Sequence, residues 1–412
     1  MRTLVTILAL GGWLFACEGT PQRDIEQPAE EPEATGAAQG TVVPPDRTGV
    51  GGRVFVVERE KESLAVYDLI RREVLEGRIT GLGNMRHAIL AFSPDLKWGY
   101  VATRSGQLSR IDLETLERAG EVFTSENSID IAISQDGRFV ATAEYDPGGV
   151  TILDARTMAV RQRIEAKDSR VTGIVDAPGN RFVAVAMEAG EVWVIDAGDP
   201  AFPVTHRIPV ARGEPYDAMI TPDGRSYVVG HLNQDVVSVV DLQRPDEGAR
   251  QVAIRGPEAR SERTAPVKLP HMASWAVAGD HVFVPLVGRA ELAVLDRSTF
   301  AYRRTIELRG HPVYAVASPA GHEVWVSFSG EDDDRFVQIV DAESLAVEQT
   351  VELGRRIYHM DFTPRGAHVL VSANGAGELY LVDASTREVV DREPLDSPSG
   401  VFGPWRAYRI GL

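Results

Sequence analysis

The sequence predicts an all-β fold, an eight-bladed β-propeller built of four-stranded antiparallel blades. A hydrophobic strand that ends in aspartate recurs eight times after residue 53, and successive aspartates lie 44, 42, 42, 45, 55, 45 and 42 residues apart. The aspartates are Asp68, Asp112, Asp154, Asp196, Asp241, Asp296, Asp341 and Asp383. A repeat of about forty residues made only of short strands is typical of propeller blades.

Each repeat contains four short strands separated by turn residues. In the second repeat these strands are HAILAFS, WGYVATR, QLSRIDL and ERAGEVFT, and PDLK forms the first turn. Apolar and β-branched residues alternate with polar ones within each strand, as expected for antiparallel sheets. Turns such as QDGR, PGNR and PDGR carry the residues that tight turns favour. No segment has the pattern of a long amphipathic helix.

The first repeat lacks the inner strand that the other repeats place about twenty residues before their aspartate. The chain ends with PSGVFGPW, residues 398–405, which has no partner in its own repeat. We therefore expect this C-terminal strand to complete the first blade and close the ring, because closure removes the exposed edges of an open array.

Composition excludes several functions. Acidic residues outnumber basic ones, 60 to 43, so a nucleic-acid partner is disfavoured. The single cysteine excludes disulfides and the CxxCH motif that attaches a covalent c-type haem. Gly49, Gly51 and Gly52 precede a strand, whereas a dinucleotide fingerprint follows one and opens a helix, so no NAD site is expected.

The first fifty residues predict export. An apolar run from Leu4 to Phe15 follows Arg2 and suits a signal-peptide core. It ends in Leu14-Phe15-Ala16-Cys17, which resembles a bacterial lipobox, so Cys17 is the predicted lipidation site. An ordinary cleaved signal is the alternative.

The predicted domains are therefore a signal peptide with lipobox over residues 1–17, a flexible tether over 18–52, and the propeller over 53–412. The tether is rich in Glu, Pro, Ala and Gly, and it has too few apolar side chains to offset its ordering entropy. We expect a periplasmic protein that touches a membrane only through its lipid anchor.

Propeller topology sorts the histidines by face. Inner strands start at one face of the ring, here called the mouth, and the turns between the second and third strands of each blade lie there too. His206 is placed on an outer strand, and the opposite, far face receives His281, His322 and His368. The mouth is expected to receive His87, His231, His271, His311 and His359. Imidazole is the commonest metal ligand and a natural proton carrier, so the mouth is the candidate site.

Arginines are expected at the same rim: Arg59, Arg86, Arg104, Arg170, Arg289 and Arg356. Guanidinium groups pair bidentately with carboxylates, so such a ring suits a flat ligand with several acidic arms. The carboxylates Glu126, Asp130, Glu214 and Asp217 are placed there as well and could balance these charges or serve as bases.

The second repeat, HAILAFSPDLKWGYVATRSGQLSRIDL, resembles the d1-haem domain of cytochrome cd1 nitrite reductases. His87 takes the place of the family's axial histidine, and Arg104 and Arg59 match arginines of its second and first blades. The ending SPSGVFGPWRAY is similar to the segment that closes that domain. The resemblance covers Val54 to Leu412 and is diffuse between these points, and the cytochrome c domain of those reductases is absent from this sequence.

The resemblance implies an exported protein of haem d1 biosynthesis that binds haem d1 or a precursor as ligand or substrate. His87 would be the axial ligand to the tetrapyrrole iron through Nε2, and the carboxylates would reach Arg59, Arg86, Arg104, Arg170 and Arg356. His271 and His311 would exchange protons with a peripheral substituent, with Asp130 as a second base.

The sequence does not decide which reaction the protein would catalyse. Oxidation of the ring periphery needs an external acceptor such as a small cytochrome c, whereas a side-chain modification needs none. Cytochrome cd1 nitrite reductase and NirN are further expected partners. Two alternatives are a non-catalytic carrier that delivers haem d1 to the nitrite reductase and an extracytoplasmic propeller scaffold for protein contacts.

Overall fold

In a computed structural model, the structure describes residues 48–211, 214–256, 264 and 274–411. Residues 47–412 form one compact unit, and residues 1–46 are assigned to another. The predicted signal peptide, the lipidation site Cys17, nearly all of the predicted tether and the candidate catalytic residue His271 lie outside the described residues. Within the described residues, no helix is both long and apolar enough to span a bilayer.

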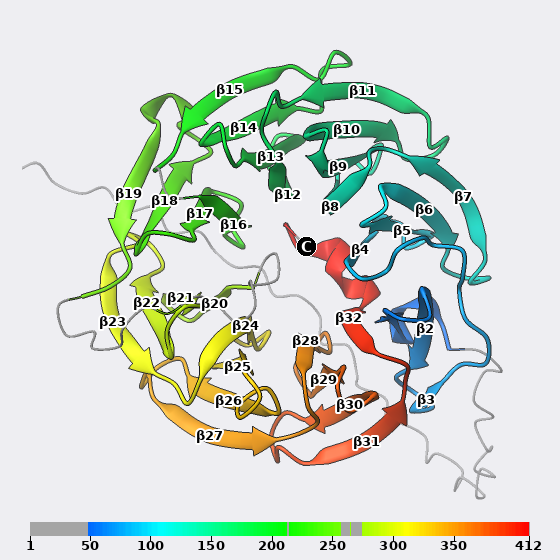
Figure 1. The fold of residues 1–412 in the computed structure, drawn as a ribbon, viewed down its shortest axis with the longest axis vertical. Coiled ribbons are helices and arrows are strands. Elements are labelled where there is room, and N and C mark those ends of the chain that lie inside the picture. Colours follow the sequence, from blue (N-terminus) through cyan, green and yellow to red (C-terminus); the bar gives the residue numbers. More distant parts are fainter. Residues whose placement is uncertain (1–47, 212–213, 257–263, 265–273, 412) are drawn as a thin grey trace, which may run out of the picture. The chain divides into compact units, whose positions relative to one another are not determined.

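Eight four-stranded antiparallel sheets are arranged in a ring (Figure 1), which confirms the predicted eight-bladed β-propeller. The space enclosed by the inner strands is here called the channel. Blades 2 to 4 consist of β4 (Ala88–Phe92), β5 (Trp98–Thr103), β6 (Gln107–Asp112), β7 (Arg118–Phe123), β8 (Asn127–Ile133), β9 (Phe139–Asp146), β10 (Gly149–Asp154), β11 (Val160–Glu165), β12 (Val171–Ala177), β13 (Arg181–Ala186), β14 (Glu191–Asp196) and β15 (Val204–Pro209). Blades 5 and 6 consist of β16 (Pro215–Ile220), β17 (Ser226–His231), β18 (Val236–Asp241), β19 (Ala249–Ala253), β20 (Ala276–Ala278), β21 (His281–Leu286), β22 (Glu291–Asp296) and β23 (Tyr302–Glu307). Blades 7 and 8 consist of β24 (His311–Ala317), β25 (Glu323–Ser329), β26 (Phe336–Asp341), β27 (Val347–Glu352), β28 (Ile357–Phe362), β29 (His368–Ala373), β30 (Glu378–Asp383) and β31 (Val389–Pro394).

Blade 1 is completed by the end of the chain, as predicted. It contains β1 (Arg53–Glu58), β2 (Ser63–Asp68), β3 (Glu73–Val74) and, as its inner strand, β32 (Pro398–Phe402). β32 runs antiparallel to β1, with Phe402 opposite Phe55 and Pro398 opposite Glu58. The first and last strands of the propeller therefore share one sheet.

The three 3₁₀ turns among the described residues are η1 (Val50–Gly52), η2 (Pro245–Glu247) and η3 (Pro404–Tyr408). η3 continues from β32 into the centre of the ring (Figure 1), where it contacts β4. The chain then crosses to blade 4, where the backbone N–H of Gly411 donates to Asp176 Oδ1 at 2.7 Å. The C-terminal segment thus lies across the channel at the far face.

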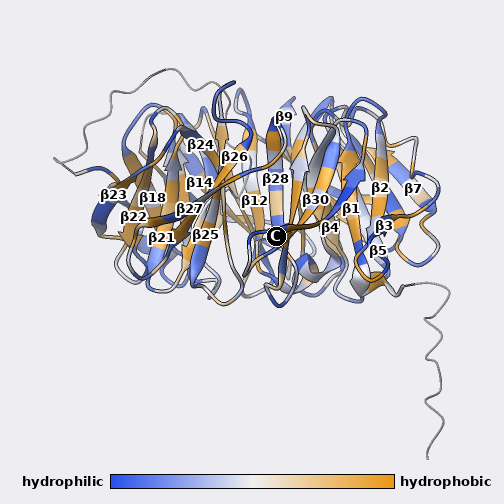
Figure 2. Ribbon diagram, turned by 90° about the horizontal axis from the view of Figure 1, so that it is seen from below, coloured by the Kyte–Doolittle hydropathy of each residue, from blue (hydrophilic) through white to orange (hydrophobic). Residues whose placement is uncertain are grey.

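Apolar side chains pack between neighbouring blades. The indole of Trp325 in blade 7 is fully buried and meets Phe362 of blade 8 edge-on, with ring centroids 5.9 Å apart. Such aromatic pairs stabilise beyond their buried area. Outer strands are more polar, and β11 is largely exposed. Figure 2 shows apolar residues along the strands and polar residues in the turns at both faces.

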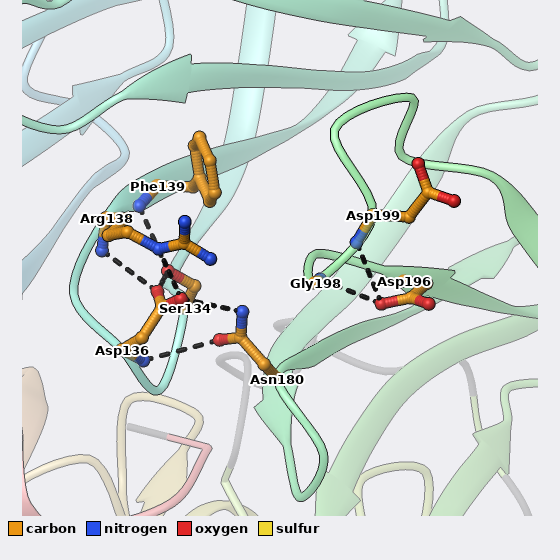
Figure 3. A network of polar contacts seen from close by, with 8 residues as sticks. All are labelled: Ser134, Asp136, Arg138, Phe139, Asn180, Asp196, Gly198 and Asp199. Atoms are coloured by element: carbon orange, nitrogen blue, oxygen red, sulfur yellow. Dashed lines mark hydrogen bonds and ion pairs between the residues drawn. The ribbon is translucent and has the colours of Figure 1, made fainter.

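The repeated aspartates end the third strand of each blade and cap the following turn. Asp196 Oδ1 accepts hydrogen bonds from the backbone N–H groups of Gly198 at 2.8 Å and Asp199 at 3.3 Å (Figure 3). The other seven aspartates accept equivalent bonds from residues two or three positions later. Aspartate suits this position because its short side chain satisfies turn N–H groups. The sequence repeat is therefore a structural feature of the far face.

Candidate functional site

His87 lies at the mouth, immediately before β4. Its Nε2 is 2.7 Å from the carbonyl oxygen of Ile129 in the next blade. A carbonyl only accepts, so Nε2 carries the proton and Nδ1 carries the lone pair. Burial lowers the pKa of His87, and the charges of Arg104 and Arg59 lower it further against the opposing effect of the Ile129 hydrogen bond. The ring is therefore neutral near pH 7.

Arg59 approaches from the first blade, in the turn between β1 and β2. Its guanidinium donates to the hydroxyl of Tyr358 at 2.5 Å and lies 4.9 Å from the centre of that ring. Its backbone N–H donates to the carbonyl of Ser397 at 3.2 Å. Both contacts join blade 1 to residues near the end of the chain, and they hold Arg59 where its charge lowers the pKa of His87.

Arg104 lies in the turn between β5 and β6, and its side chain is exposed. Its backbone N–H donates to the carbonyl of His87 at 3.0 Å. Gly106 in the same turn has a φ of +74°, and a Cβ there would lie 1.8 Å from the carbonyl oxygen of Ser125. Only glycine allows this close approach to the next blade. The turn therefore presents the Arg104 charge at the mouth.

Two buried carboxyl groups lie below this rim on inner strands. Asp130 of β8 and Asp217 of β16 are 5% and 3% exposed. Burial raises the pKa of Asp130 to about 8, and the charge of Asp217 adds to the shift. Ser274 Oγ donates to Asp217 Oδ2 at 3.1 Å. At neutral pH the protonated form of Asp130 therefore predominates.

A buried cation, the guanidinium of Arg406, reaches the inner strands from the far face of the ring. Arg406 of η3 has its guanidinium 3.8 Å from Asp361 Oδ2 of β28, and both side chains are buried. Burial raises the pKa of Asp361, and Arg406 opposes that shift. The same guanidinium charge also acts to lower the pKa of Asp130. The C-terminal segment therefore sets part of the electrostatics of the channel.

The family described as "Cytochrome D1 heme domain" matches residues 51–407. The chain belongs to the cytochrome D1 haem domain family.

Within the cytochrome D1 haem domain family the chain is similar to NirF proteins. "Protein NirF" of Pseudomonas aeruginosa is 38% identical over 376 residues, which cover 89% of this chain and 95% of that protein. "Protein NirF" of Stutzerimonas stutzeri is 35% identical over 372 residues, covering 88% and 94%. The solved structure of "Dihydro-heme d1 dehydrogenase NirN in complex with DHE" has a TM-score of 0.75 at 24% identity, over 88% of this chain and 78% of that one. That structure supports the fold.

The sequence predicted five arginines around His87 at the rim, and the structure gives these arginines different surroundings. Arg170 is tied to Glu188, with Nε and Oε1 2.7 Å apart, and lies over the ring of Tyr145. Arg86 is exposed and 3.8 Å from Glu60. Arg356 is exposed and precedes β28. Arg59 and Arg104 are thus the two arginines whose charges act on His87.

The histidines divide between the rim and the channel wall. His311 begins β24 at the mouth and is partly exposed. His231 ends β17, with Nε2 2.9 Å from Ser238 Oγ, and burial lowers its pKa to about 4. His359 does not reach the rim as the sequence predicted. It packs between Tyr314 and Phe402, with centroids 4.6 Å and 5.4 Å away, because it lies inside β28.

Sequence reasoning missed the tyrosines of the site. The hydroxyl of Tyr358 accepts a hydrogen bond from the Arg59 guanidinium. The pKa of Tyr145 is affected by Tyr216 and Arg170, and the pKa of Tyr216 is affected by Tyr145 and Arg104. Burial is the main cause that raises both pKa values. Tyr216 and Tyr358 are each the second residue of an inner strand, in PYDAM and IYHMD. This shared position in the repeat is the sequence signal that could have identified Tyr216 and Tyr358 as site residues.

Proposed function

We propose that this protein binds a d1-type iron tetrapyrrole at the mouth of the propeller and acts in haem d1 biosynthesis. Its membership of the cytochrome D1 haem domain family and its similarity to NirF over nearly the whole length of those proteins support this function. The observation that carries it is the grouping of a neutral His87 with the guanidinium groups of Arg59 and Arg104 at one rim.

His87 fits an axial ligand to the tetrapyrrole iron. A ligating histidine is neutral and usually donates its other ring N–H to a carbonyl, as His87 does to Ile129. With the ring oriented in this way, Nδ1 carries the lone pair that iron would use. Iron coordination through Nε2 would require the ring to leave Ile129.

Arg59 and Arg104 would pair with the carboxylates of the tetrapyrrole. The Arg59 guanidinium rests on Tyr358, and the exposed Arg104 side chain has room to turn toward a ligand. Charge-assisted pairs of this kind are among the stronger hydrogen bonds. Arg170 would first have to leave Glu188, so we assign it a smaller share of the binding.

We further propose that the protein modifies or oxidises the ligand periphery, with Asp130 as a group that exchanges a proton with it. Oxidation of a dihydro precursor releases two protons and two electrons, so Asp130 would accept a proton and small cytochrome c molecules would take the electrons one at a time. Asp130 lies on an inner strand below the rim, and its pKa of about 8 leaves a fraction ionised at neutral pH that can accept a proton. His311 at the mouth would be the second group that exchanges protons. His271, which the sequence predicted for the same role, remains a further candidate. A haem d1 carrier is the alternative, since binding alone uses His87 and the arginines but not Asp130.

The binding proposal is tested by absorbance titration of the protein with ferric haem d1 or its dihydro precursor, without oxygen. We expect a saturable spectral change, and His87→Ala should weaken binding at least about tenfold because a metal–ligand bond is lost. His322→Ala is the matched control, since His322 lies in a far-face turn. No spectral change with either ligand would overturn the proposal.

Asp130→Asn separates an enzyme from a carrier. If Asp130 accepts a proton from the ligand periphery, the variant should bind the dihydro precursor with unchanged affinity, and its conversion should be slower by about a hundredfold or more. Absorbance recorded over time, with a small cytochrome c as electron acceptor, measures that conversion. Binding without conversion in the intact protein would favour the carrier.

The localisation rests on the N-terminal sequence. We propose that the protein is periplasmic and held to a membrane through lipidated Cys17. The variant Cys17→Ser should move from the membrane fraction to the soluble periplasmic fraction. Retention of this variant in the membrane fraction would contradict the proposal.

A further inference from the structure

Glu58 is a buried carboxylate at the point where the ring closes. It is the last residue of β1, and its side chain is fully buried. Oε2 accepts hydrogen bonds from Ser63 Oγ at 2.9 Å and Arg78 Nε at 2.6 Å, and Oε1 accepts one from the backbone N–H of Asp396 at 3.1 Å. Both oxygens are thus bonded, to blade 1 on one side and to the closing segment, residues 395–402, on the other.

Glu58 and Arg59 bind consecutive residues of the closing segment. The Glu58 side chain accepts from Asp396, and the backbone N–H of Arg59 donates to the carbonyl of Ser397. Ser63 is at the other end of the same turn and is bonded to Glu58. The turn that carries Arg59 is therefore held at its start, at its end and from across the seam.

We infer that Glu58 is a positioning residue that directs the Arg59 guanidinium toward the tetrapyrrole; this inference rests on the proposed function. Arginine has many rotamers, and ordering it on binding costs entropy. A turn that is fixed before binding confines the side chain to the side of Tyr358, where it already lies. The cost of ordering Arg59 is then met during folding, and affinity for a ligand carboxylate rises.

A double-mutant cycle tests this role through the dissociation constant for ferric haem d1, measured by absorbance. Glu58→Gln keeps the shape of the side chain and removes its charge. It should weaken binding about tenfold in the native background and less than about twofold in an Arg59→Ala background. Equal losses in the two backgrounds would show that Glu58 does not act through Arg59, and the inference would fail.

Glu323→Gln is the matched control. Glu323 is a partly buried carboxylate between blades 7 and 8 at the far face, where it accepts from Trp325 Nε1 at 2.9 Å and from the Arg387 guanidinium at 3.1 Å. This variant should lower the denaturation midpoint as Glu58→Gln does and leave haem d1 affinity unchanged. An equal loss of affinity in both variants would mean general loosening of the ring and would refute the positioning role.

Two further measurements keep the inference separate from the proposed function. If Glu58→Gln does not fold, Ser63→Ala removes one of the three hydrogen bonds and should weaken binding by about threefold, again only when Arg59 is present. A crystal structure of the Glu58 variant without ligand should show Arg59 displaced from Tyr358. Arg59 still in contact with Tyr358 would overturn the positioning role even if no tetrapyrrole binds.

Discussion

Replacing Asp130 with asparagine should stabilise the fold while it removes a candidate catalytic group. The carboxyl of Asp130 has its pKa raised from 3.8 to about 8 because it is buried. In the unfolded chain it ionises near pH 4, whereas in the folded protein it stays protonated until about pH 8. The contribution of this group to the free energy of unfolding is therefore fully present below about pH 4, and it is lost as the pH rises toward 8.

The size of the effect follows from the pKa difference. Each unit is worth about 1.4 kcal/mol, so the folded state is disfavoured by about 1.5 kcal/mol at pH 5 and up to about 4 kcal/mol at pH 7. Asparagine does not ionise, and its Oδ1 can still accept from the backbone N–H of Ile131, which Asp130 bonds at 2.9 Å. Asp130→Asn should therefore gain roughly these amounts.

Urea denaturation at pH 5, 7 and 8.5 measures the prediction through the difference between the variant and the native protein. That difference should grow with pH and level off above about pH 8. Asp361→Asn is the control, and it should be destabilising because it leaves the buried guanidinium of Arg406 without its carboxylate. A difference for Asp130→Asn that is negative or constant with pH would refute the reasoning.

Three further outcomes are expected. Affinity for haem d1 should stay constant between about pH 6 and 8, because the pKa of His87 is lowered; a titration with a midpoint near 6.5 would contradict this. Arg104→Ala should weaken haem d1 binding by about tenfold and Arg170→Ala by about threefold or less, and equal losses in absorbance titrations would contradict the assignment. Gly106→Ala should cost about 2 kcal/mol in denaturation experiments, and Gly190→Ala, which has a φ of +65° but open space around it, about 1 kcal/mol. Equal costs would show that the close approach at Gly106 does not matter.

The fold could be predicted in detail because its signal is local and repeated. Each blade ends its third strand with an aspartate that caps a turn, as Asp196 does, so the period was visible in the sequence. The closing strand could be predicted because the first blade lacked a strand and the chain end supplied one. Propeller topology then placed His87, Arg59 and Arg104 on one face without any knowledge of side-chain contacts.

The chemistry of the site could not be predicted to the same depth. Protonation of Asp130 depends on burial by neighbouring blades, which no local pattern encodes. His359 follows the same sequence pattern as the rim histidines, yet Tyr314 and Phe402 enclose it in the wall. Tyr358 was not among the predicted site residues, because aromatic residues are common in strands and give no separate signal there. In each case the deciding partner comes from a distant part of the chain.

Because of the closing strand, blade 1 is begun first and completed last during synthesis of the chain. Blade 1 begins at Arg53 and remains a three-stranded sheet until residues 398–402 have been synthesised. Arg59 depends on Tyr358 and Ser397, so its place at the rim also waits for the last part of the chain. We expect a polypeptide that stops before residue 398 to have seven complete blades and no finished rim. Binding of a tetrapyrrole at this rim would therefore require the closing strand.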